Sequence, residues 1–214
     1  MHRIDQPQTT PVGPHQIPRK VRVQPHQFVD LLLTRGYADV TVEEIAERAN
    51  VGRSTFYMHH AGKEEILKQA MQRPSAFLAA IVGQDPESEA LVPILIHFRE
   101  QRKLNRVFFS WPIRPIWVSC LAQMIEPRLA TLLRKTGAAR PILPLGLIAQ
   151  QMAEAQIALV ANWLGGKFSC RPEAVAEALI ATTHANMRAL LRWKFDAPPI
   201  IPGEKPRILQ RVES

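Results

Sequence analysis

The chain has 214 residues, of which 46% are hydrophobic, enough for one large domain or for a small domain joined to a larger one. Its two cysteines, Cys120 and Cys170, argue against a disulfide framework and against a multi-cysteine zinc site. The formal net charge of +8 permits binding to nucleic acid, although charge alone assigns no function.

The N-terminus has no apolar signal core, and charged residues interrupt the later apolar stretches before they reach membrane-spanning length. We therefore expect a soluble, cytoplasmic protein. Residues 1–18 are rich in proline and predict a disordered arm. The arm ends in Arg19, Lys20 and Arg22, which could contact the minor groove or the phosphates of DNA; a solvated tail without a specific role is the alternative.

The first helix is expected at Pro25–Arg35, because proline is tolerated at the first helical position and Gly36 provides a stop. A second helix follows Thr41, which forms a capping-box pattern with Glu44 three residues later. Asn50 tolerates the left-handed conformation, so this helix can end there in a sharp turn.

The next short helix starts near Gly52 and has the sequence Arg53-Ser-Thr-Phe-Tyr-Met-His-His60. It has few aliphatic residues for a core helix and many side chains that can form hydrogen bonds. Arginine, serine and threonine can contact base edges or phosphates, and tyrosine and histidine can contact phosphates. This pattern favours a helix that enters the major groove of DNA.

Ala61-Gly62 breaks that helix, and Lys63-Glu-Glu-Ile-Leu67 opens another. The order I-A-x-x-A-x-V-x-R-S-T-F-Y-x-H-x-x-x-K-E-x-I-L, read from Ile45 to Leu67, resembles the helix-turn-helix of TetR-family transcriptional regulators. The first helix differs from the usual family pattern at its start, and Gly52 stands where a capping serine is common. A three-helix surface hairpin without a DNA role is the alternative.

Three residues are candidates for contact with bases or nearby phosphates, three others for phosphate positioning, and Thr41 for a helix cap that also touches the DNA backbone. The first set is Arg53, Ser54 and Thr55, and the second is Tyr57, His59 and Lys63. Phe56 is expected to face the core of the small domain.

The rest of the chain predicts an all-α bundle with a flexible tail. The expected helices are Lys63 to about Arg73, with a kink or restart at Pro74, then Pro86–Lys103, Leu104–Ser110, Ile116–Lys135, Leu145–Leu164 and Pro172–Lys194, with a rigid connector at Trp111–Pro115. The resulting domains are an arm at 1–18, an N-terminal three-helix helix-turn-helix DNA-binding domain at 19–67, a C-terminal helical ligand-binding and dimerisation bundle at 68–196 and a tail at 197–214.

The two last helices each carry an apolar stripe and further small residues off that stripe. The predicted stripes are Ile148, Met152, Ala155, Leu159 and Trp163, and Val175, Leu179, Thr182, Asn186, Ala189 and Trp193. One face can meet the bundle core while the other meets a second subunit, so we expect a homodimer. Two fully internal helices in a monomer are the alternative. The resemblance implies the same helix pair as a four-helix dimer interface.

The resemblance also implies a repressor that a small-molecule ligand releases from a palindromic double-stranded DNA operator, through a shift of the helix that begins at Lys63. The candidates for an aromatic pocket with a polar handle are Phe108, Phe109, Trp111, Trp117, Met124, Gln156 and Trp163. For each of these residues, core packing is the competing interpretation.

No catalytic motif, metal site or cofactor site is expected, because His59 and His60 are adjacent and neither a HExxH, a glycine-rich phosphate loop nor a GxSxG pattern occurs. The remaining alternative is a helical, dimeric protein-interaction or thiol-responsive module in which Cys120 or Cys170 acts as sensor. Buried, inert thiols would argue against the thiol version.

Overall fold

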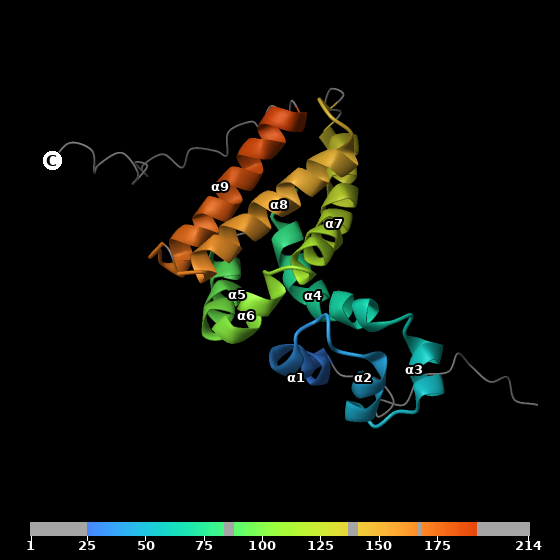
Figure 1. The fold of residues 1–214 in the computed structure, drawn as a ribbon. Helices are drawn as coiled ribbons and strands as arrows, with labels where there is room; N and C mark the ends of the chain where they lie inside the picture. The colour runs from blue at the N-terminus through green and yellow to red at the C-terminus, as the bar shows by residue number, and fades with distance from the viewer. Residues whose placement is uncertain (1–24, 84–87, 137–140, 167, 192–214) are drawn as a thin grey trace, which may run out of the picture.

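The computed structural model describes residues 25–83, 88–136, 141–166 and 168–191, and all regular structure within these ranges is helical. The helices are α1 (Pro25–Arg35), α2 (Val42–Arg48), α3 (Arg53–His59), α4 (Lys63–Ala80), α5 (Ser88–Glu100), α6 (Arg102–Phe108), α7 (Ile113–Thr136), α8 (Leu145–Leu164) and α9 (Pro172–Leu191). Figure 1 shows two parts, with α1 to α3 on one side of the molecule and α5 to α9 on the other. The predicted all-α fold is therefore confirmed, while the predicted arm and tail lie outside the described residues.

The local signals of the N-terminal part gave the correct helix ends. Helix α1 has the predicted bounds, and the capping box of Thr41 and Glu44 starts α2. Asn50 has a φ of +53°, the left-handed conformation that the turn after α2 requires. Helix α3 ends at His59, and α4 starts at Lys63 as expected.

Helix α4 joins the two parts (Figure 1). It runs without a break from Lys63 to Ala80, so it neither ends near Arg73 nor restarts at Pro74. Pro74 removes one backbone hydrogen bond, but Ser75, Leu78 and Ala79 are buried immediately after it. Helix α4 contacts α1 and also α7 of the bundle.

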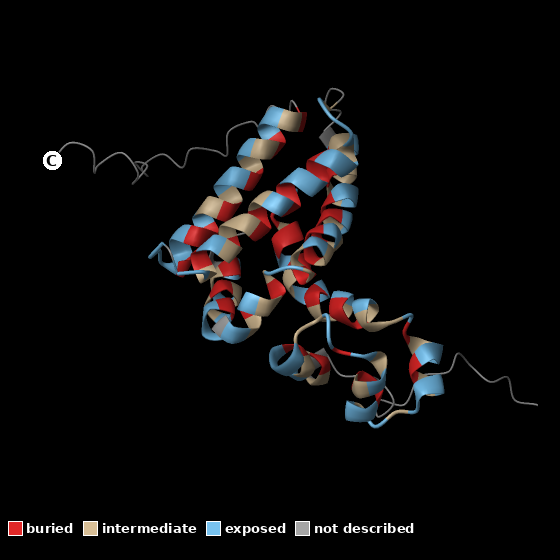
Figure 2. Ribbon diagram, viewed as in Figure 1, coloured by how far each residue is buried: buried red, intermediate tan, exposed pale blue. Residues whose placement is uncertain are grey.

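The bundle is built around α7, which packs against both α4 and α8, while α9 packs against α5 and α8. Figure 2 shows the buried residues on the inward faces of these helices. Four rings form a cluster in which Trp117 contacts Phe98 and Phe108 edge to face, at centroid distances of 6.1 and 6.0 Å, and lies 4.6 Å from Phe109.

Several predicted boundaries in the bundle are wrong. Helix α7 begins at Ile113 and so includes Pro115, which had been assigned to a rigid connector. Proline is compatible with the first turn of a helix, where its missing amide hydrogen has no intrahelical acceptor. The helix predicted from Pro86 is described from Ser88 and ends at Glu100, and α6 starts before Leu104, at Arg102.

The stripe predicted for α8 is correct in outline, since Ile148, Met152 and Trp163 are buried and Ala155 and Leu159 are half-buried. The stripe predicted for α9 is wrong at Thr182 and Ala189, which are exposed, whereas Asn186 is half-buried and the predicted Trp193 lies outside the described residues. The buried row of α9 repeats every four residues, at Val175, Leu179, Thr183, Met187 and Leu191. Such a row is one of the two ridges that helices use in packing, whereas the prediction had alternated steps of four and three.

Candidate nucleic-acid interface and effector cavity

The turn between α2 and α3 is fixed by backbone contacts. The amide of Val51 donates to the carbonyl of Ala46 at 2.9 Å, and the amide of Phe56 donates to the carbonyl of Gly52 at 2.9 Å. Gly52 is the N-cap of α3 without a side-chain cap. The two short helices are thus held as one helix-turn-helix unit.

Phe56 anchors α3 and determines which of its faces is exposed. Its side chain is buried against Tyr57 and His60, at ring-centroid distances of 5.5 and 5.2 Å, and this agrees with its predicted role. Tyr57 is half-exposed and Met58 is 71% exposed. The outward face of α3 therefore combines a large apolar side chain, which the sequence analysis did not consider, with polar ones.

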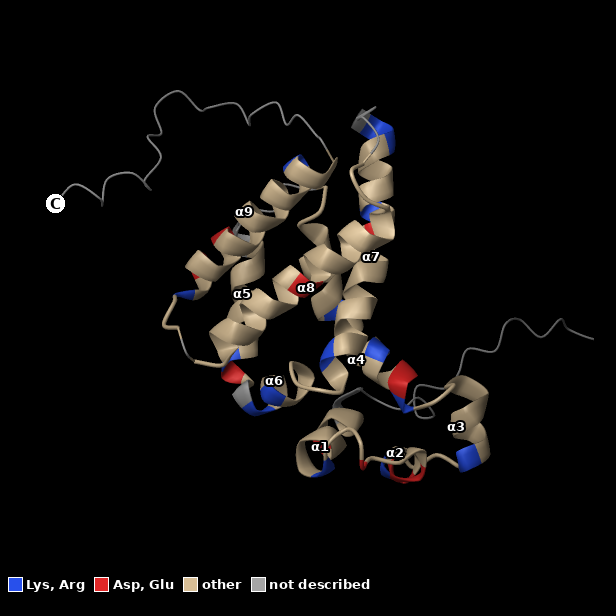
Figure 3. Cartoon of the chain, turned by 45° about the horizontal axis from the view of Figure 1, so that its top comes forward, with Lys and Arg blue, Asp and Glu red and all other residues tan. Residues whose placement is uncertain are grey.

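The predicted base-reading residues lie at the start of that outward face. Arg53 and Ser54 are exposed, and Thr55 and His59 are half-buried. The guanidinium of Arg53 forms an ion pair with Glu43 of α2, with Nη2 2.6 Å from Oε1. Figure 3 shows the acidic start of α2 beside the basic start of α3. Glu43 was missed because no sequence spacing connects residues on two different helices.

Lys63 has a structural role that no sequence pattern indicated, and its contact with DNA phosphate stays a prediction. Its Nζ donates to three backbone carbonyls, those of Tyr37, Ala38 and Val40, at 2.8, 3.1 and 2.8 Å. An ammonium group has three donors, so these bonds use all of them. The ammonium also lies 4.8 Å from the centroid of the Tyr37 ring. Lys63 therefore ties the start of α4 to the loop between α1 and α2.

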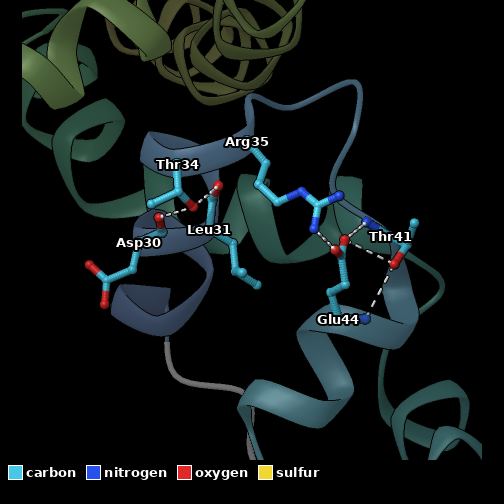
Figure 4. Close-up of polar contacts among 6 residues, drawn as sticks. All are labelled: Asp30, Leu31, Thr34, Arg35, Thr41 and Glu44. Atoms are coloured by element: carbon cyan, nitrogen blue, oxygen red, sulfur yellow. Dashed lines mark hydrogen bonds and ion pairs between the residues drawn. The ribbon is translucent and has the colours of Figure 1, made fainter.

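Thr41 is exposed and its hydroxyl is engaged in the helix cap. The amide of Glu44 donates to the Thr41 hydroxyl at 3.3 Å, and the amide of Thr41 donates to the Glu44 carboxylate at 2.9 Å (Figure 4). Arg35 approaches the same carboxylate at 2.5 Å (Figure 4). The hydrogen bonds from Thr41 and the charge of Arg35 hold the pKa of Glu44 below its ordinary value.

The seven candidate effector-binding residues do not form one pocket, so that part of the prediction is not reproduced as a single site. Phe108, Phe109 and Trp117 lie together, whereas Trp111 is 82% exposed. Met124 lines a separate hollow between α4 and α7. Trp163 donates to the carbonyl of Cys170.

The predicted polar handle, Gln156, is buried between α8 and α9. Its Nε2 donates to the hydroxyl of Thr183 at 3.0 Å, while its Oε1 has no hydrogen-bond partner among the described residues. Gln156 lines none of the three cavities described for the helical part of the chain. It contributes to the packing of α8 on α9 rather than to these cavities.

One cavity of about 520 Å³ lies where α1 meets the bundle, and we call it the aromatic cavity. The described residues that line it are Val29 of α1; Ala70, Arg73, Pro74 and Phe77 of α4; Pro93, Ile94, His97 and Phe98 of α5; and Gln101, Leu104, Asn105, Phe108 and Trp117. Of the predicted pocket residues, it contains Phe108 and Trp117. Sequence reasoning missed the others because they come from five separate segments.

Two other hollows differ in chemistry. The one between α4 and α7, about 640 Å³, is lined by small side chains such as Ala76 and Ala79 and by the cations of Arg128 and Lys135. The smaller one, about 350 Å³, lies beside Phe109 and Trp111 and includes the ion pair between Arg114 and Glu154. The described lining of neither hollow has the aromatic rings on several helices that surround the aromatic cavity.

The two cysteines have different surroundings. Cys120 is half-buried, and desolvation by burial raises the pKa of its thiol, with a smaller opposing influence from Lys68. Cys170 is exposed. A raised pKa reduces the thiolate fraction at neutral pH, so the environment of Cys120 is opposite to that of a sensor thiol.

Comparison with known proteins identifies the N-terminal part. Residues 29–70 match the bacterial regulatory proteins of the tetR family. The chain is 40% identical over 93 residues to the HTH-type transcriptional regulator TcmR of Streptomyces glaucescens, an alignment that covers 38% of this chain and 41% of TcmR. The matched region thus spans about two fifths of that relative. The likeness to the tetR family thus rests on the helix-turn-helix at residues 29–70.

Solved structures that this chain resembles include a TetR transcriptional regulator from Streptococcus agalactiae 2603V, at 24% identity and a TM-score of 0.48, covering 77% of this chain and 91% of that one. A putative TetR-family regulator from Syntrophomonas wolfei has 17% identity and a TM-score of 0.49, covering 78% of this chain and 92% of that one.

Among the described residues, no three His, Cys, Asp or Glu side chains are grouped so that they could hold a metal ion. The described helices also contain none whose length and apolar character would let it cross a membrane.

Proposed function

We propose that the protein is a DNA-binding transcriptional regulator, a repressor that a small-molecule effector releases from a palindromic operator. The exposed face of α3 carries this proposal, because Arg53, Ser54 and Tyr57 are presented to solvent by a helix whose opposite side is anchored through Phe56. A recognition helix that contacts base edges needs this arrangement. Thr55, His59, Thr41 and Lys63 complete the proposed DNA-contacting set.

A homodimer is the proposed functional unit. The outward side of α9 presents a row of small residues at helical spacing, Ala174, Ala178, Ala181 and Ala185, which are exposed or half-buried. Small side chains allow two helices to approach closely, and α8 adds Ala158 and Ala161 to the same kind of surface. A two-fold dimer would place two copies of α3 in successive major grooves, about 34–36 Å apart, and would read a palindromic site.

We place the DNA-binding domain at residues 19–67 and the effector-binding and dimerisation domain at 68–196. The proposed boundary falls inside α4, since this helix starts at Lys63 and continues to Ala80. One continuous helix therefore belongs to both proposed domains. An effector acts on DNA binding only if it has a higher affinity for the arrangement of α4 that binds DNA less well.

Binding of the purified protein to promoter fragments that flank its own coding region tests the DNA-binding part. The wild type is compared at two salt concentrations with an Arg53→Ala/Tyr57→Ala double variant and with an Arg134→Ala control, whose cation is exposed near the end of α7. We expect saturable, salt-sensitive binding that the double variant loses and the control keeps. Equal binding by all three proteins would exclude α3 as the reading helix.

A helical, dimeric interaction or thiol-responsive module is the alternative. Cys120→Ser and Cys170→Ser variants that fold normally but no longer respond to an oxidant such as diamide, in any DNA or partner interaction, would favour it. The raised pKa of Cys120 speaks against that residue as the sensor. We therefore expect both variants to retain wild-type DNA binding.

A further inference from the structure

The aromatic cavity has walls that select for a flat, apolar molecule. Its volume, about 520 Å³, lies within the range of small-molecule sites, roughly 300–1,000 Å³. Phe98 and Phe108 both contact the edge or face of Trp117 nearly at right angles, with interplanar angles of 87° and 82°. These interlocked rings form a rigid wall, and aromatic rings attract further rings in stacked or edge-to-face geometry.

The polar groups of the aromatic cavity select for a negative charge. Arg73 supplies a cation, and the described lining residues include no Asp or Glu. Within the described part of the chain, no carboxylate forms an ion pair with Arg73. His97 and Gln101 lie on the same lining and can donate hydrogen bonds. A cationic ligand would meet an unbalanced positive charge here, whereas an anion would neutralise it.

A buried polar side chain shows that the aromatic cavity has more than an apolar interior. Asn105 lines it and is only 5% exposed. Its amide nitrogen donates to the carbonyl of Phe98, which fixes the amide plane and joins α6 to α5. The side-chain oxygen of Asn105 is a further acceptor for a hydroxyl group on a ligand.

We propose that the aromatic cavity binds a flat aromatic molecule with an anionic group, with its ring system against Phe98, Phe108 and Trp117 and its anion at Arg73. This inference rests on the proposed function only in taking such a molecule to be the effector. The cavity wall includes Val29 of α1 and Pro74 and Phe77 of α4. A ligand there touches both the DNA-binding domain and the helix that joins it to the bundle.

The experiment uses three probes with the full-length chain in a titration calorimeter. The first is 2-naphthoate, an aromatic anion; the second is 2-naphthamide, its neutral counterpart; the third is decanoate, an aliphatic anion. Each is titrated into the wild type, into Arg73→Gln and into an Arg128→Gln control. Arg128 lines the separate hollow between α4 and α7. Phe77→Ala tests the aromatic wall at a side chain that is 39% exposed and therefore lies outside the fully buried core.

We expect saturable binding of 2-naphthoate, tighter than that of either other probe. Arg73→Gln should weaken 2-naphthoate about tenfold, as the loss of one charge-assisted contact at a partly exposed site does, and should leave 2-naphthamide unchanged. Arg128→Gln should change neither probe. Phe77→Ala should weaken both naphthyl probes alike, because it removes aromatic contact but no charge.

Several outcomes would overturn the inference. Absence of saturable binding by both naphthyl probes excludes an aromatic site, and tighter binding of decanoate indicates a site for an alkyl chain. Equal affinity of 2-naphthoate for the wild type and Arg73→Gln removes Arg73 from the site. The DNA assay is separate: Arg73-dependent binding of 2-naphthoate without any change in operator binding supports this inference and contradicts the effector-release part of the proposed function.

Discussion

The N-terminal part and the C-terminal bundle are each stabilised by a different kind of contact. Helices α2 and α3 have seven residues each, whereas α7, α8 and α9 have 24, 20 and 20. Seven-residue helices are not stable alone in water. Those of the N-terminal part depend on directional contacts, namely the capping box, the left-handed Asn50 and the ammonium of Lys63. The bundle depends on wide apolar faces instead. Single polar substitutions should therefore disturb α3 far more than the bundle.

Phe56→Ala is expected to give the largest difference between the stabilities of the N-terminal part and the bundle. Loss of this buried ring should cost about 3–5 kcal/mol of unfolding free energy and abolish DNA binding, because the ring anchors α3. All four tryptophans follow residue 110, so their fluorescence reports on the C-terminal part. In urea, circular dichroism should detect an early transition that tryptophan fluorescence does not.

The matched control for that substitution is Met58→Ala, on the exposed side of α3. It should leave both transitions in place. Coincident shifts of the dichroism and fluorescence transitions in Phe56→Ala would mean that the two parts unfold as one unit. That result would contradict the view that each part is stabilised separately.

Lys63→Met should have the second-largest effect. It removes three hydrogen bonds to the carbonyls of Tyr37, Ala38 and Val40, and buried or half-buried polar groups without partners cost about 1–3 kcal/mol. Denaturation in the absence of DNA measures this loss. Lys68→Met is the control, because its ammonium is exposed and pairs with Glu64 along the same helix. If Lys63 serves only to contact phosphate, the stability of the free protein will not change.

Thr41→Ala should destabilise the N-terminal part by about 1 kcal/mol, the usual loss for an N-cap residue, whereas Thr41→Ser should retain the cap. Hydrogen bonds from Thr41 lower the pKa of Glu44 in the folded state. The stability they contribute is therefore present above the pKa of the unfolded chain and is lost as the pH falls through the lowered value. Thermal denaturation of both proteins should give a difference at pH 7 that shrinks on acidification. A difference independent of pH would show that the carboxylate takes no part in the cap.

Glu43→Gln should change stability least, since the ion pair with Arg53 is exposed and such pairs contribute about 0–1 kcal/mol. It should nevertheless tighten DNA binding several-fold, because it removes a negative charge near the phosphates and releases the guanidinium of Arg53. Glu47→Gln, an exposed carboxylate on the same helix, is the control. Weaker operator binding by Glu43→Gln would mean instead that Glu43 orients Arg53 toward a base.

The same contrast explains how much could be predicted from the sequence. The helix-turn-helix follows from signals that act within four residues, such as Thr41 with Glu44 and the conformation of Asn50, so its elements were placed correctly. The contacts of Lys63 join residues 23 to 26 positions apart, and no local spacing indicates them. They became visible only once the chain was folded.

In the bundle, the type of a residue did not indicate whether its side chain is buried or exposed. Trp111 and Trp117 are equally aromatic, but the first is 82% exposed and the second is 2% exposed. The wall of the aromatic cavity was only partly anticipated for the same reason, since Arg73 and His97 come from different helices and carry no motif. Helix periodicity also predicted a single row on α9 with alternating steps of four and three residues. The observed row, with four-residue steps throughout, became clear only once the neighbouring helices were in place.

The continuity of α4 has one more consequence. Because Pro74 has no amide hydrogen, the carbonyl of Ala70 lacks its usual helical donor, and the helix bends most easily at this point. Lys63 lies 11 residues before the proline, a distance of about 16 Å along the axis at 1.5 Å per residue. A tilt of only about 5° at Pro74 would then displace the start of α4 by roughly 1.4 Å, the size of the helix shifts that switch regulatory proteins. Molecular contacts at one end of a single helix would thereby be converted into a change of spacing at the other.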